Sequence, residues 1–319
     1  MRFLLLLCCI APAILFSQFA PAAGKPGSTA IAYDSSCFKD WAVTCNLRLG
    51  YRDSTQPDSG YVNVGTAVSA LGPAKENGVV SLGDGGSATL TFQRPIENGP
   101  GWDFAVFENS FLDTFLELAF VEVSTDGQRF VRFPAVSYSD TLVQTPAFGY
   151  TFPEKINNLA GKYRVGFGTP FDLEELKDSA GLDIQDIRFV RIIDVIGSLQ
   201  NTLAQRDYLG NKINDPWPTP FPSSGFDLDA VGVIHSAFSS LSQPATTSIQ
   251  TAPNPSNGNF TIFSEEYQSY TLSTLQGQTA AQGTLQVGNN TIQLSLPDGI
   301  YVLTLEKNNN KQRLQIRTE

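Results

Sequence analysis

Apolar residues recur at every second position through the middle of this chain, and glycine, proline, asparagine and aspartate separate one run from the next. One run occupies residues 87–92. Another, at 119–124, leads through Asp126-Gly127 into a third at 129–133. Successive side chains of a strand point to opposite faces, so period two is typical of strands with one buried face, and Asp-Gly between two runs predicts a hairpin.

Further strand-like runs lie at residues 104–107, 187–195 and 230–234, whereas only residues 172–178 have the spacing of a helical turn. The 319 residues include 27 glycines and 19 prolines and are only 16% charged, a composition that suits turn-rich β structure. About eight strands without alternating helices predict an all-β fold, a β-sandwich of jelly-roll type over residues 60–236.

The chain begins with a basic residue, an almost unbroken apolar run at residues 3–16 and small residues at 20–23. These are the charged, apolar and cleavage regions of a secretory signal peptide, which we expect at residues 1–22. A membrane anchor is disfavoured, because the run is shorter than the roughly 20 residues that span a bilayer and Pro12 interrupts it.

Two of the four cysteines lie inside this apolar run, without a lipobox-like sequence, and should leave with the signal peptide. Cys37 and Cys45 remain, in an N-terminal segment at residues 23–59. Export exposes a chain to an oxidising compartment, so we expect these two to form a disulfide that pins a loop, contributing about 2–3 kcal/mol at most. A zinc site is the alternative, but zinc takes four ligands and only His235 is available as a further one.

The net charge of −10 resides in residues 23–249, which hold 26 acidic and 16 basic residues. Such a surface repels phosphate backbones and anionic lipids. Nucleic acid and membrane surfaces are therefore not expected as partners, nor is membrane insertion once the signal peptide is removed. Divalent cations and neutral ligands are the expected binding partners.

Acidic residues are dense between Arg94 and Arg129, a stretch without any other Lys or Arg. Like charges at this density destabilise a fold unless something neutralises them, and calcium is the hard cation that carboxylate and carbonyl oxygens bind in extracellular proteins. The predicted ligands combine this stretch with a pair of aspartates two apart on a later strand: Asp103, Glu108, Asn109, Asp227 and Asp229. The alternative is that these groups are solvated or pair with Arg164, Arg188 and Arg191.

Prolines stand at every second position of residues 216–222, which keeps the segment extended and excludes it from a central strand. This stiff loop carries Trp217 and Phe221. Aromatic rings held in this way are candidate ligand-binding residues that stack on a sugar ring. The alternative is a strap whose rings pack onto the sandwich and bury their area there.

Catalytic signatures are weak. His235 is the one histidine of the chain, and no Gly-x-Ser-x-Gly elbow accompanies it. Residues 83–86, Gly-Asp-Gly-Gly, lack the Lys and Ser/Thr of a phosphate loop and form a turn instead. We therefore expect a protein that binds and is not an enzyme; a hydrolase with paired carboxylates at residues 103–122 is the alternative.

The segment 251–319 begins with NPSNGNF at 254–260, continues in short alternating runs through Gly277 and Gly-Ile-Tyr at 299–301, and closes on a basic end. It resembles the type A C-terminal sorting domain of the type IX secretion system. The resemblance implies a small β-sandwich, recognition by the secretion machinery, removal by a sortase-like peptidase, and attachment to the outer-membrane surface or release. The polar residues 237–250 are expected to be a linker.

The middle of the chain also carries a set of motifs. They are ALG at 70–72, VSLGDGG at 80–86, DFAVFEN at 103–109, FVEVS at 120–124, RFVRI at 188–192 and GFDLDAV at 225–231. Together they resemble a group of uncharacterised bacterial cell-surface proteins, similar in general to discoidin-like, galactose-binding jelly rolls. The resemblance implies an extracellular protein that binds a glycan or another extracellular polymer, and it leaves open a purely structural or adhesive role.

Overall fold

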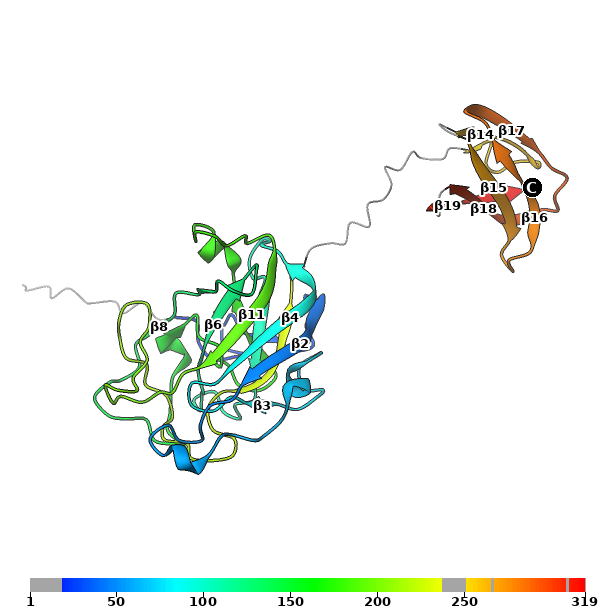
Figure 1. The fold of residues 1–319 in the computed structure, drawn as a ribbon. Coiled ribbons are helices and arrows are strands. Elements are labelled where there is room, and N and C mark those ends of the chain that lie inside the picture. The colour runs from blue at the N-terminus through cyan, green and yellow to red at the C-terminus, as the bar shows by residue number, and fades with distance from the viewer. Residues whose placement is uncertain (1–18, 237–250, 265–266, 308–309, 319) are drawn as a thin grey trace, which may run out of the picture. The chain divides into compact units, whose positions relative to one another are not determined.

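The computed structural model describes residues 19–236, 251–264, 267–307 and 310–318, and the chain divides into an N-terminal unit up to Ser239 and a C-terminal unit from Ser240 (Figure 1). Most of the predicted signal peptide, and the predicted linker, lie outside the described residues. The first described residues pack on the N-terminal unit, where the Phe19 amide donates a hydrogen bond to the Glu154 carbonyl at 3.0 Å. Within the described parts, no helix is long and apolar enough to span a membrane.

Ten strands of the N-terminal unit join one hydrogen-bonded path. They are β1 (Ile31–Ala32), β2 (Asp40–Arg48), β3 (Val80–Ser81), β4 (Ser87–Ile96), β5 (Phe104–Glu108), β6 (Ala119–Ser124), β7 (Val131–Arg132), β10 (Phe167–Phe171), β11 (Ile187–Asp194) and β12 (Asp227–Val233). Their order is β1-β10-β5-β12-β2-β4-β11-β6-β7, with β3 beside β12. The strands β8 (Val136–Ser137) and β9 (Ile156–Asn157) pair separately, and the helical segments described are the 3-10 turns η1 (Pro57–Ser59), η2 (Ala67–Ala70), η3 (Pro153–Lys155) and η4 (Leu173–Leu176).

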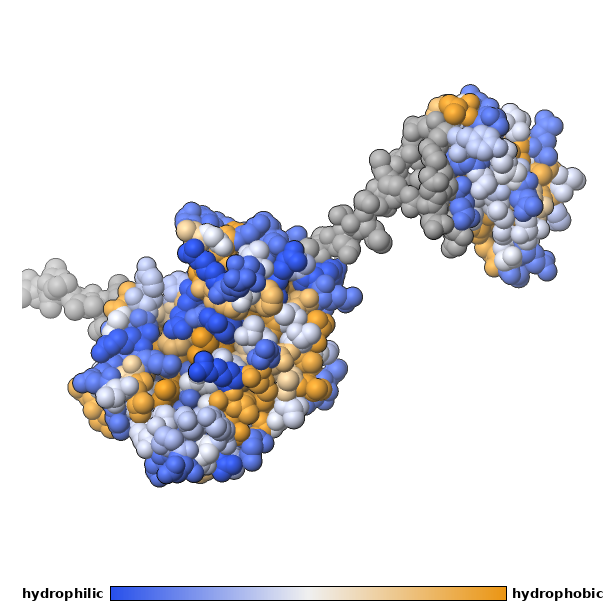
Figure 2. All heavy atoms as spheres, viewed as in Figure 1, coloured by the Kyte–Doolittle hydropathy of each residue, from blue (hydrophilic) through white to orange (hydrophobic). Residues whose placement is uncertain are grey.

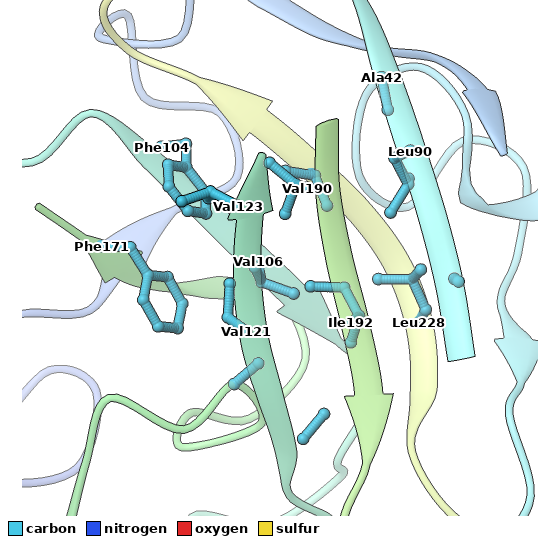
Figure 3. Packing of buried hydrophobic residues seen from close by; sticks show 14 of the residues in the cluster. Ala42, Leu90, Phe104, Val106, Val121, Val123, Phe171, Val190, Ile192 and Leu228 are labelled. Carbon is cyan, nitrogen blue, oxygen red and sulfur yellow. The ribbon is translucent and has the colours of Figure 1, made fainter. Parts of the chain in front are cut away.

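The path folds over at the short pairing of β2 with β12, so that two antiparallel layers face each other. Side chains of β5, β10 and β12 meet those of β4, β6 and β11 in one buried cluster. Figure 3 shows labelled members from both layers, among them Val106 and Leu228 from one and Val121 and Ile192 from the other. This sandwich confirms the predicted all-β class, and the predicted runs and the helical turn are found at their expected places.

Both faces of several central strands are covered by other parts of the unit. A second cluster, around Phe120 and Leu118, packs on the outer face of β6, and a third joins Phe107 and Ala230 to the rings of Phe38 and Trp41. Strands buried on two faces favour continuous apolar runs. All residues of β5, β6 and β12 are accordingly buried.

The sequence predicts that the sandwich starts at residue 60, but in the structure it begins earlier. β1 pairs with β10, and β2 pairs with β4 through residues 42–48. The segment 23–59 is therefore part of the sandwich.

Cys37 and Cys45 are free thiols, and the predicted disulfide is wrong for this structure. β2 is extended from Asp40 onward, and at about 3.3 Å per residue it carries Cys45 roughly 16 Å from its start. Cys37 stays in the preceding turn, where its sulfur accepts a hydrogen bond from the Ser35 hydroxyl at 3.2 Å. Cys45 packs against the main core, and burial raises its pKa to about 11.

The C-terminal unit is a smaller β structure with its own core. Its strands are β13 (Thr251–Ala252), β14 (Asn259–Ser264), β15 (Gln268–Thr274), β16 (Thr279–Leu285), β17 (Gly288–Gln293), β18 (Gly299–Lys307) and β19 (Asn310–Thr318). They form the sheets β13-β14-β17 and β16-β15-β18-β19, and residues such as Phe260, Leu272 and Leu303 are buried together. Gly277 has a φ of +83° in the turn between β15 and β16, a conformation that favours glycine.

Candidate functional site

One end of the N-terminal sandwich collects acidic side chains from six places in the sequence. β5 ends at Glu108 and β12 begins at Asp227, and the antiparallel pairing of these two strands places both residues at one edge. β11 ends at Asp194, and a hydrogen bond from the amide of Phe226, just before β12, brings that strand end to the same edge. Three loops at this edge supply the others. We define the acidic cluster as Asp84, Glu108, Glu117, Asp194, Asp215 and Asp227, whose charges raise one another's pKa values.

Backbone amides hold several of these carboxylates. Asp194 accepts hydrogen bonds from the amides of Phe226 at 2.7 Å and Gly85 at 2.9 Å. One oxygen of Asp215 accepts from the Leu118 amide, and one oxygen of Glu108 accepts from the Ser110 amide, both at 2.7 Å. The acidic cluster therefore ties the loops at this edge to one another.

Burial and mutual repulsion make these acids hard to ionise. Burial raises the pKa of Glu108 and of Asp194 to about 8, and that of Asp227 to about 6. The pKa values of Asp215 and of Glu117, which keeps some surface exposure, also lie well above the usual range, first through desolvation and then through neighbouring carboxylates. Among the described residues, no Lys, Arg or His forms an ion pair with any member.

Two oxygens of the acidic cluster lack any hydrogen-bond partner although they are buried: Glu108 Oε1 and Asp215 Oδ1. In each residue a backbone amide holds the other oxygen. Buried polar atoms are almost always satisfied, so an unpaired carboxylate oxygen calls for an explanation such as a water or an ion.

The structure brings together three of the five predicted metal ligands. Glu108 and Asp227 lie in the acidic cluster, and the Asn109 side chain hydrogen-bonds to Asp227. Asp103 lies at the other end of β5, where its oxygens accept from the Leu173 and Gly99 amides at 2.7 Å and meet His235 Nδ1 at 2.8 Å.

Asp229 is also placed elsewhere. A register shift in β12 between Leu228 and Ala230 breaks the simple period of two, and the Asp229 carboxylate accepts from the Lys75 amide at 2.9 Å. Asp103 and Asp229 therefore lie apart from the other three predicted ligands. Sequence reasoning missed Asp84, Asp194 and Asp215 and did not select Glu117. The one available signal was that Asp194 ends an apolar strand-like run.

Exposed aromatic rings gather on loops of the same unit. Phe111 stacks on Phe115 with ring centroids 4.8 Å apart, Phe115 lies 6.2 Å from Phe148, and Phe148 lies 5.8 Å from Phe221. We call these four residues the aromatic row. Phe111 is 62% exposed, Phe148 69% and Phe221 39%, whereas Phe115 is buried beneath them. In Figure 2, hydrophobic patches interrupt the hydrophilic surface of the N-terminal unit.

Trp217, the other predicted ligand-binding residue, is not part of this surface. Its side chain is only 6% exposed, and its indole nitrogen donates a hydrogen bond to Asp84 at 3.3 Å. The proline loop thus works as a strap at Trp217 and as an exposed surface at Phe221.

A hollow of about 410 Å³ lies beside Phe148. Polar groups of Asp140, Tyr150, Lys155 and Asn214 line it together with apolar ones. Asn214 also donates a hydrogen bond to the Val143 carbonyl at 2.8 Å, which fixes one wall of the hollow.

Two further hollows contain candidate groups. One, of about 520 Å³, is lined by Arg48, Asp84 and the stacked rings of Tyr51 and Tyr61, whose centroids are 4.6 Å apart. The other, of about 540 Å³, is lined by residues that include Glu97 and His235.

Comparisons with known proteins identify the C-terminal unit. Residues 251–317 match the family described as the secretion system C-terminal sorting domain. This supports the predicted sorting domain at 251–319 and the predicted partner, the type IX secretion machinery. The chain is an exported protein, destined for the cell surface or for secretion. The comparison with curated proteins found no match.

Solved structures give only distant similarities. PorZ, a surface component of the type-IX secretion system of Porphyromonas gingivalis, aligns with 9% identity and a TM-score of 0.22 over 40% of this chain and 21% of that one. The BSP domain of a biofilm associated protein aligns with 10% identity and a TM-score of 0.20 over 77% and 49%. A Ruminococcus gnavus β-glucuronidase aligns with 9% identity and a TM-score of 0.23 over 94% and 45%. Each alignment covers less than half of the other chain.

Proposed function

We propose that the N-terminal unit is a cell-surface binding module that takes an extracellular glycan on the aromatic row. The observation that carries the proposal is the exposure of Phe111, Phe148 and Phe221, which come from three separate loops and are joined through successive ring contacts. Sugar rings present apolar faces that stack on aromatic side chains, and the polar groups in the hollow beside Phe148 suit hydroxyl groups. The likeness to galactose-binding jelly rolls, a prediction from the sequence, agrees with this role.

Binding is favoured over hydrolysis by the distribution of carboxylates. Glycoside hydrolysis uses a pair of carboxyl groups about 5–10 Å apart on either side of the scissile bond. Each of the three hollows described above is lined by a single one: Asp84, Glu97 or Asp140. Glu108 and Asp227, which do lie together, are buried. A polysaccharide placed in any of these hollows would meet one carboxylate.

A glycan-array screen of the full chain, followed by titration calorimetry with the best glycan, tests the proposal. Phe148→Ala and Phe221→Ala should each weaken binding about tenfold without lowering the melting temperature, because both rings are exposed. Tyr61→Ala is the matched control, since it removes an exposed ring from a different hollow and should leave affinity unchanged.

Three outcomes contradict the proposal. Binding that depends on Tyr61 and not on Phe148 or Phe221 moves the ligand to the other hollow. Release of reducing sugar from a bound glycan shows a hydrolase. The absence of any bound glycan favours a structural or adhesive surface role.

A further inference from the structure

We propose that the acidic cluster binds a calcium ion that joins the strand ends and loops at its edge of the sandwich. The site is separate from the aromatic row, and the inference does not depend on a glycan ligand. It differs from the site predicted by sequence, because Asp103 and Asp229 are engaged elsewhere. Four residues enter instead: Asp84, Glu117, Asp194 and Asp215.

The first argument is charge. Six carboxyl groups share this edge, and among the described residues none of them has a cationic partner. By contrast, Glu122 and Asp113, two acids of the same unit, each pair with arginine. Buried carboxylates without a cation must either hold protons or bind a metal ion.

The second argument is the pair of unpartnered oxygens. Glu108 Oε1 and Asp215 Oδ1 are buried without a hydrogen bond, while amides of Ser110 and Leu118 hold the other oxygen of each. The Leu118 amide that holds Asp215 belongs to a residue whose carbonyl accepts a hydrogen bond from the Val195 amide at 2.9 Å, so Asp215 lies at the same edge as Asp194. Oxygens that are fixed in orientation, desolvated and unpaired are suitable metal ligands.

The third argument selects the metal. The donors are carboxylates and the amide of Asn109, with no sulfur or imidazole in the acidic cluster, which favours a hard cation over zinc. Within the described residues, no three His, Cys, Asp or Glu side chains converge as a ready-made metal site. The ion's shell must therefore include amide, carbonyl or water oxygens. Calcium accepts such mixed, irregular shells of six to eight oxygens, whereas magnesium requires near-ideal octahedral geometry.

The position of the cluster gives the ion a structural role. Glu108 opens the loop that carries Phe111 and Phe115, and Asp215 opens the loop that carries Phe221. An ion held between Glu108 and Asp215 would fix the bases of both loops. Calcium should therefore order the aromatic row, and only this expectation rests on the proposed function.

The experiment uses the full chain, stripped of metal with a chelator and dialysed. Elemental analysis after re-equilibration with 1 mM calcium should find about one bound ion per chain, and calcium should raise the melting temperature by several degrees. Magnesium at the same concentration should have a smaller effect. The proposal would be overturned if no calcium were bound and if neither calcium nor chelator changed the melting temperature. This holds whatever the variants below show.

Glu108→Gln and Asp215→Asn should lower calcium affinity at least tenfold. Their metal-free forms should melt at or above the wild-type temperature, because each removes a buried, repelled acid. Glu76→Gln, an exposed acid outside the cluster, is the matched control and should keep the full calcium response. Variants that bind calcium like the wild type would also overturn the assignment. Glycan affinity is measured separately, so a failed glycan screen leaves the calcium result intact.

Discussion

Trp217 is the residue for which the sequence left both ligand stacking and packing open. Its indole ring is buried and donates a hydrogen bond to Asp84. We therefore expect Trp217→Ala to lower the free energy of unfolding by about 3–5 kcal/mol, because the removed ring leaves a cavity. Phe221→Ala, on the same loop but exposed, should cost less than about 1 kcal/mol. Urea denaturation of both variants measures the difference. Equal losses would show that Trp217 is not a packing strap.

Lys162 provides a test by pH. It is 3% exposed, its ammonium group donates to the Ile156 carbonyl at 2.7 Å, and burial lowers its pKa from 10.5 to about 8. Between pH 8 and 10.5 the unfolded chain holds a proton that the folded chain has released. The free energy of unfolding should therefore rise with pH across this window, by roughly 3 kcal/mol at 1.4 kcal/mol per pKa unit. Below pH 8 both the folded and the unfolded chain hold the proton, so this rise should be absent there.

Lys162→Met should remove that rise, and Lys177→Met, at an exposed lysine, should keep it. Urea denaturation at pH 7.5, 9 and 10.5 checks both variants against the wild type. A wild-type slope that survives in Lys162→Met would assign the effect to another group.

At the scale of elements, β6 is held to both neighbours through one side chain. Glu122 lies opposite Arg132 of β7 and Arg191 of β11 and forms ion pairs with both, at 2.8 Å to Arg132. We expect Glu122→Ala to destabilise the fold by about 1–3 kcal/mol, because two cations then remain side by side without their shared partner.

The matched change is Glu174→Ala, which breaks an exposed pair with Lys177 and should cost far less than Glu122→Ala, because solvent screens that pair. A double-mutant cycle of Glu122 with Arg191 isolates the cross-strand coupling. A coupling near zero would mean that the pair contributes only through packing.

At the scale of the whole molecule, the C-terminal unit has its own core and matches a sorting domain, so the export signal and the proposed binding surface belong to different units. Deletion of residues 251–319 should retain the protein in the periplasm of a host with type IX secretion, without changing the melting temperature of the N-terminal unit. Cell fractionation and calorimetry measure the two effects. Surface display of the truncated chain would contradict the assignment.

Removal of the tail is a further expectation from the resemblance to type A sorting domains. Mass spectrometry of surface protein from the native host should find peptides of the N-terminal unit and none from residues 251–319. Intact surface protein that still carries Glu319 would contradict removal.

The sequence by itself determined the strands and the export signal, because both are local. Period two and Asp-Gly at 126–127 predict the β6–β7 hairpin without knowledge of its neighbours, and NPSNGNF is read directly from adjacent residues. Tertiary structure decided which distant side chains meet. Glu108, Asp194 and Asp215 come to one edge only because antiparallel pairing aligns the ends of β5 and β12, and hydrogen bonds from the Phe226 and Leu118 amides hold Asp194 and Asp215 there. The bulge in β12 that diverts Asp229 and the burial of Trp217 likewise depend on register and packing, which no periodicity in one segment encodes.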